Sequence, residues 1–147
     1  MFSGCRGFSS LDLSGFDTRT VTDMWAMFDN CSSLSSLDLS GFNTSNVTNM
    51  SGMFQECRVL SSLDLSGSFD TRSVIDMNSM FCNCSGLMTI YASDNFVTDS
   101  VTYCDDMFRN CLSIVGGSGT TFDSSKTDKT YARIDAPGSP GYFTVAP

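Results

Sequence analysis

The stretch LSSLDLSGFNTSNVTNMSGMFQEC, from Leu34 to Cys57, decides the fold of this chain, because nearly the same text recurs along most of its length. The stretch ends in the motif Met-Phe-x-x-Cys. This motif begins at Met1, Met27, Met53, Met80 and Met107, so successive copies are 26, 26, 27 and 27 residues apart. A fixed period of this size indicates a solenoid, in which each unit stacks on its neighbours.

One unit can be interpreted residue by residue. The alternation in Leu37-Asp38-Leu39 predicts a short strand whose leucines face a core while Asp38 faces solvent. Thr44 stands where a helix N-cap would be, and apolar residues at helical spacing follow as far as Phe54. We expect a helix of only one or two turns there, in part 3₁₀. The predicted fold class is therefore an α/β solenoid of short parallel strands and short helical turns.

Composition changes after the last motif. All three prolines and both lysines follow Cys111, and glycines occupy positions 116, 117 and 119, where the next unit would place apolar strand residues. Stacking must stop there, and a solenoid needs a cap over its open core. We therefore predict a solenoid of four to five units over residues 1–114, closed by a small β cap over 115–147 with strands at 130–134 and 142–145.

The N-terminal end has no matching cap. Met1 and Phe2 stand inside a repeat, which leaves an apolar stacking face bare. We therefore expect a fragment of a longer array, and self-association through this face is the alternative.

Charge and residue content narrow the class of function. A net charge of −8 argues against nucleic acid and anionic membrane as partners, since both require clustered Lys and Arg. The chain has no histidine, which removes the commonest general base and metal ligand. No apolar run approaches the roughly 20 residues of a membrane helix. Adjacent residues point apart in regular structure, so Asp105 and Asp106 cannot act together as an acid–base pair. With no such pair and no histidine, we expect no enzyme, no cofactor and no metal site.

Five of the seven cysteines hold the same position in successive units. Strands about 4.8 Å apart would permit disulfides between them. Identical partners in a row give no unique pairing, however, and buried thiols behave as small hydrophobes. We predict a reduced structural column, with bridges as the alternative, and leave open whether Cys82 and Cys104 are free thiols. The cysteine column consists of Cys5, Cys31, Cys57, Cys84 and Cys111.

The best surface candidate for a binding site is a row of aspartates on the predicted strands. The row places one carboxylate at the outward middle of each of three strands, beside serines, and Tyr91 ends it as an aromatic anchor. An acidic face can serve solubility alone and prevent strand pairing. It can also bind a basic protein patch, or calcium weakly, although oxygens in line suit calcium poorly. The candidate binding residues are Asp12, Asp38, Asp64, Tyr91, Ser36 and Ser62.

The pattern LxxLxL is the strand signature of leucine-rich repeats. The longer unit LSSLDLSGFNTSNVTNMSGMFQECxxL resembles the BspA-type leucine-rich repeat of bacterial surface proteins, and the resemblance covers Met1 to about Ile114. One unit departs from it, with Ile90-Tyr91-Ala92 in place of Leu-Asp-Leu.

The resemblance implies a non-enzymatic, extracellular or cell-surface module that mediates adhesion, with host matrix proteins or other microbial surfaces as partners. The family offers no catalytic residues to carry over. The chain shows no signal peptide, which this resemblance attributes to truncation. The alternative function is a structural spacer or filament segment that assembles through the bare N-terminal face.

Overall fold

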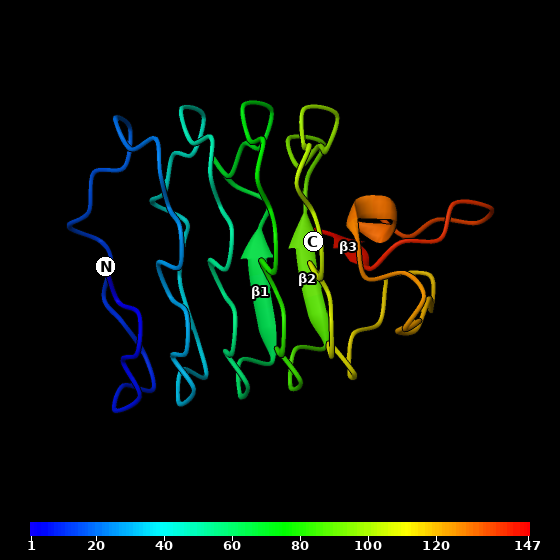
Figure 1. Ribbon diagram of the computed structural model, residues 1–147, viewed down its shortest axis with the longest axis horizontal. Helices are drawn as coiled ribbons and strands as arrows, with labels where there is room; N and C mark the ends of the chain where they lie inside the picture. The colour runs from blue at the N-terminus through cyan, green and yellow to red at the C-terminus, as the bar shows by residue number, and fades with distance from the viewer.

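The computed structural model describes residues 1–147 and shows a series of similar loops lying side by side (Figure 1). Regular secondary structure is sparse: β1 (Ser62–Leu65), β2 (Thr89–Ala92), the 3₁₀ helix η1 (Lys129–Tyr131) and β3 (Phe143–Val145). The remainder is turn and loop. The fold is thus mostly turn and loop around a small parallel three-stranded sheet, consistent with a repeat, solenoid-like arrangement. Its single short helix has neither the length nor the apolar character that crossing a bilayer requires.

The three strands form one parallel sheet in the order β1-β2-β3. Leu63 pairs with Ile90, and Ile90 pairs with Phe143 of the C-terminal tail, so that all three side chains enter the core. The unit that lacks Leu-Asp-Leu therefore keeps the same alternation, because Ile90 and Ala92 are buried. The predicted strand at 142–145 is present as β3.

Two strand predictions are wrong. Residues 130–134 contain the end of η1, which Asp128 caps by accepting a hydrogen bond from the Thr130 N–H at 2.8 Å. The leucine segments 11–13 and 37–39 form no regular strands. Their own backbone groups make no bond between units; just before them, the carbonyl of Ser9 accepts from the N–H of Ser35 at 2.9 Å and of Ser36 at 3.4 Å.

The segment predicted as a short helix is a run of turns. The N–H groups of Ala26, Phe28 and Asn30 donate to carbonyls of the next unit, at 2.7–2.9 Å. The residues between them donate instead to the carbonyl three positions earlier. Each unit also has two left-handed positions, such as Ala26 (φ 51°) and Asn30 (φ 57°), which no right-handed helix contains. Bonding between units therefore replaces bonding within a helix.

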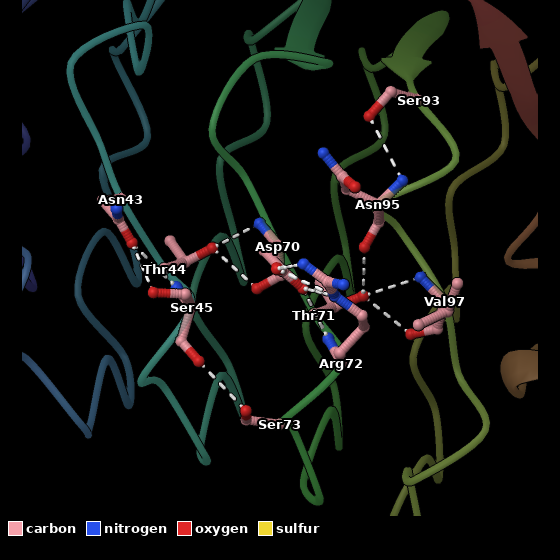
Figure 2. Close-up of polar contacts among 10 residues, drawn as sticks. All are labelled: Asn43, Thr44, Ser45, Asp70, Thr71, Arg72, Ser73, Ser93, Asn95 and Val97. Atoms are coloured by element: carbon pink, nitrogen blue, oxygen red, sulfur yellow. Dashed lines mark hydrogen bonds and ion pairs between the residues drawn. The ribbon is translucent and has the colours of Figure 1, made fainter.

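Thr44 was predicted to cap that helix and instead joins two units (Figure 2). Its buried hydroxyl donates to the carbonyl of Asp70 at 2.8 Å and accepts from the N–H of the same residue at 2.7 Å. Thr18 makes the equivalent pair of bonds with Asn43, and Thr71 with Val97. The threonine column thus satisfies backbone groups in places where water cannot reach.

Stacked phenylalanines run through the core at one ring per unit. The centroids of Phe2, Phe28, Phe54, Phe81 and Phe108 follow one another at 5.7, 5.7, 5.7 and 5.3 Å. In the tail, Tyr142 and Phe143 meet the last ring edge-on, at 5.0 and 6.0 Å. The N–H of Phe108 donates to the carbonyl of Thr127 in the tail, at 2.9 Å, just as it would donate to a further unit. The C-terminal end of the core is therefore covered.

The tail is held in shape by one buried carboxylate. Asp135 accepts hydrogen bonds from the backbone of Ser118, Thr120 and Gly141, at 2.8–3.2 Å, and from the hydroxyl of Thr120 at 2.7 Å. Burial alone would raise the pKa of Asp135, but these bonds outweigh it and hold the pKa below its ordinary value. The charged form therefore organises the loop beside β3.

Replacing Thr44 by valine should destabilise the whole stack. The change leaves the buried N–H and carbonyl of Asp70 without a side-chain partner, at roughly 1–3 kcal/mol for each group. We expect the free energy of unfolding, measured by equilibrium urea denaturation, to fall by about 2 kcal/mol or more. Thr48→Val is the control, because its exposed hydroxyl makes only a surface bond to Thr22 at 3.2 Å. Equal losses in the two variants would contradict this role for Thr44.

Candidate functional site

The aspartate row lies on the exposed side of the sheet and of the segments that precede it. Asp64 of β1 is the register partner of Tyr91 in β2, and Tyr91 is the partner of Thr144 in β3. Asp12 and Asp38 are exposed at the equivalent place in the two preceding units. Tyr91 therefore does not end the row. Sequence reasoning missed Thr144, although it predicted a strand at its position, because nothing in the repeat pattern indicates which strand the tail joins.

Each carboxylate of the row is fixed by a turn. One oxygen of Asp12 accepts hydrogen bonds from the N–H and the hydroxyl of Ser14, at 3.0 and 2.7 Å. One oxygen of Asp64 likewise accepts from the N–H and the hydroxyl of Ser66, at 2.9 and 2.6 Å. Asp38 accepts from the N–H of Ser40 at 2.9 Å. In all three cases the second carboxylate oxygen has no partner in the protein.

Two of these turns also favour the ionised form of their carboxylate, at Asp12 and Asp38. The side-chain bond from Ser14, followed by the backbone bond, holds the pKa of Asp12 below its ordinary value, and Ser40 has the same effect on the pKa of Asp38. The serines that contact the carboxylates are therefore those that follow them. The predicted residues Ser36 and Ser62 are exposed, but their hydroxyls make no hydrogen bond.

Shallow hollows separate neighbouring carboxylates. One of about 200 Å³ lies between Asp38 and Asp64, with Phe69 among its lining residues. The other, of about 320 Å³, lies between Asp12 and Asp38 and includes Phe42. Each hollow thus presents two carboxylates beside an apolar lining.

Four of the five arginines of the array form ion pairs with nearby acids, and Arg6 takes part in none. The pairs are Arg19 with Asp17, Arg58 with Glu56, Arg72 with Asp70 (Figure 2) and Arg109 with Asp106. The aspartate row takes part in none of these pairs, so its charges have no cation within the chain. No group of three or more His, Cys, Asp or Glu side chains is arranged to hold a metal ion.

The cysteine column is bonded to the backbone. All seven cysteines are free thiols; Cys82 is buried and Cys104 half-buried. In four members of the column, the thiol donates to the phenylalanine carbonyl of the preceding unit. These pairs are Cys31 to Phe2 (3.1 Å), Cys57 to Phe28 (3.2 Å), Cys84 to Phe54 (3.0 Å) and Cys111 to Phe81 (2.9 Å).

The buried thiols of Cys57 and Cys111 should resist alkylation and disulfide exchange in the folded protein. Burial raises the pKa of Cys57 and of Cys111 to about 12, so both remain neutral thiols through the mildly alkaline range in which Ellman's reagent is used. We expect Cys104 to react in the native protein, and Cys57 and Cys111 to react only after guanidinium unfolding. Labelling of Cys57 in the native state as fast as Cys104, read by peptide mass spectrometry, would contradict this placement.

Comparison with known proteins gives one match. A family model described as "Mycoplasma protein of unknown function, DUF285" covers residues 1–129. No curated protein and no solved structure matches the chain. The matched range holds all five Met-Phe-x-x-Cys motifs and continues into the tail, ending before β3. The chain belongs to the DUF285 family.

Proposed function

We propose that this chain is a non-enzymatic recognition module, a leucine-rich-repeat stack of the BspA type, that binds a protein partner through the aspartate row. The repeat class is supported by the LxxLxL pattern and by the burial of Leu63, Leu65 and Ile90 on the core side of the sheet. The proposed location is the bacterial surface or the medium. Host matrix proteins or other microbial surfaces are the proposed partners, and both proposals rest on the resemblance of the repeats to surface proteins.

One observation carries the binding site. The three carboxylates of the row stand in line, and each accepts a hydrogen bond from the serine two residues later through one oxygen. The second oxygen of each is free, and none of the three forms an ion pair within the chain. Such a row complements a patch of Lys and Arg, because a guanidinium can bond a free carboxylate oxygen. The phenol of Tyr91 extends the row with the kind of side chain that anchors interfaces. The net charge of −8 would speed the approach of a basic partner.

The test is a binding screen against extracellular matrix proteins by surface plasmon resonance. The key variant is Asp12→Asn/Asp38→Asn/Asp64→Asn, in which the amide oxygen still accepts the serine bond, so the turn survives and only the charge is lost. We expect binding that weakens at least about tenfold in this variant and in high salt, as for exposed charge pairs that steer association.

The matched control is Asp94→Asn/Asp99→Asn/Asp105→Asn. It removes the same charge from exposed aspartates that lie outside the row and in no ion pair. An equal loss of affinity in both triple variants would show a general charge effect and would contradict the aspartate row as the binding site. Absence of saturable binding by the parent protein would sink the function.

The second candidate is a structural spacer that assembles through its N-terminal face. A mostly apolar hollow of about 190 Å³ lies there, and the ring of Phe2, the first of the phenylalanine stack, is half-buried. Another unit could cover both. The hollow is lined in part by Met1, Phe16, Val21, Met24, Trp25 and Met27.

Assembly of this kind predicts a sedimentation coefficient that rises with protein concentration. Val21→Asp, which places a charge in the apolar hollow, should abolish that rise. A coefficient independent of concentration over the micromolar range would remove this candidate and leave the recognition module.

A further inference from the structure

A separate hollow lies on the turn segments of three successive units. The turn segments and the strands bury their alternate residues in one core cluster, so this hollow and the aspartate row lie on opposite sides of that core. Its volume is about 370 Å³, within the roughly 300–1,000 Å³ of pockets that hold small ligands. We call it the Trp25 hollow. It is lined by Trp25, Ala26, Asp29, Ser51, Gly52, Gln55, Asn78 and Ser79.

The floor follows directly from the repeat. Ala26, Gly52 and Ser79 occupy the same left-handed position in their units, with φ of 51°, 61° and 55°, and all three have small side chains or none. Their backbone donors are already used. The N–H of Ala26 donates to Ser51 at 2.9 Å, and that of Gly52 donates to Asn78 at 2.8 Å. A ligand in this hollow must therefore bind to side chains.

Trp25 departs from its own column. Equivalent positions in the following units hold Ser51, Asn78 and Asp105, so stacking does not require an aromatic there. The side chain is nonetheless a tryptophan, the residue is 67% exposed, and its indole N–H has no partner in the protein. An exposed indole face is apolar yet electron-rich, which suits the C–H groups on one face of a sugar ring.

Three polar side chains that line the same hollow have unused hydrogen-bonding capacity. The amide of Gln55 makes no hydrogen bond, and its oxygen lies beside Gly52, 3.3 Å from where a Cβ would stand. Asn78 uses its oxygen to accept from the Asp105 N–H at 2.7 Å, which leaves its amino group free. Asp29 accepts only from Ser3, at 3.3 Å, through one oxygen. Free donors and free acceptors thus stand together, as a ligand with several hydroxyls requires.

We propose that the Trp25 hollow binds a neutral saccharide, with one sugar ring against the indole and its hydroxyls bonded to Gln55, Asn78 and Asp29. Acidic or sulfated sugars are disfavoured by Asp29 and by the net charge of −8. A peptide is a poorer occupant, because recognition of an extended peptide relies on open backbone groups, and those of the floor are taken.

Trp25 is the single tryptophan of the chain, so any change in tryptophan fluorescence comes from this residue. The probes are neutral hexasaccharides built from glucose, mannose, galactose or xylose, with sialyllactose, a heparin hexasaccharide and an oligolysine peptide as charged arms. The protein is used at a concentration at which sedimentation shows a monomer, because Trp25 also borders the N-terminal hollow. We expect a saturable change in emission with at least one neutral hexasaccharide and none with the charged probes.

Variants are compared by isothermal titration calorimetry with the hexasaccharide that binds. Trp25→Ser installs the residue that its column carries at Ser51, so the fold should be retained, and binding should weaken about tenfold or more. Gln55→Ala should weaken binding severalfold. Tyr103→Ser, at an exposed aromatic outside the hollow, is the control and should bind like the parent.

The proposal is overturned if no neutral hexasaccharide gives a saturable response, if Trp25→Ser binds as the parent does, or if a charged probe gives a saturable change in Trp25 emission at a lower concentration than any neutral one. The Asp12→Asn/Asp38→Asn/Asp64→Asn variant should keep saccharide binding, because the row is remote from the hollow. Failure of this site and failure of the aspartate row are therefore distinguishable.

Discussion

The rest of the structure depends on the donation of alternate backbone N–H groups from each unit to the carbonyls of the next. Between Met24 and Cys31 every second N–H leaves its own unit, and the intervening ones close tight turns. This requirement excludes a helix, because a helix would keep all of its donors. It also fixes the register of the units, so that equivalent residues stand beside one another. The phenylalanine stack, the threonine column and the cysteine column all follow from that register.

The same register decides where binding residues can lie. Asp12, Asp38 and Asp64 hold the same exposed position in three successive units, so one aspartate per repeat becomes a row of carboxylates. A small residue at a left-handed position becomes a continuous floor, as at Ala26, Gly52 and Ser79. Departures from the repeat therefore stand out as candidate specificity determinants. Tyr91 stands where the aspartate of the next unit would be, and Trp25 stands in an otherwise polar column; both are partly or largely exposed.

The sequence predicted the parts of the fold that depend on alternation and period. Burial of Leu63 and Leu65 followed from the strand pattern, and β3 from a predicted strand at 142–145 in the tail. The helix and its Thr44 cap were mispredicted, because apolar spacing fits a helix and a run of tight turns equally well. Only the cross-unit bonds, which local propensity does not reveal, separate the two. The pairing of Thr144 with Tyr91 and the Trp25 hollow were missed for the same reason, since each joins residues distant in the chain.

The bonds that join the units have one further consequence. A cysteine thiol meets a backbone carbonyl, a threonine hydroxyl meets a backbone peptide group, and a ring meets an identical ring. None of these contacts depends on which particular unit comes next, so one unit can replace another without loss of the contacts. Unequal recombination could add or remove a 26-residue segment within the gene without creating a mismatched joint. Repeat number, and with it the reach and valency of the array, is thus a property that selection can adjust while each joint stays the same.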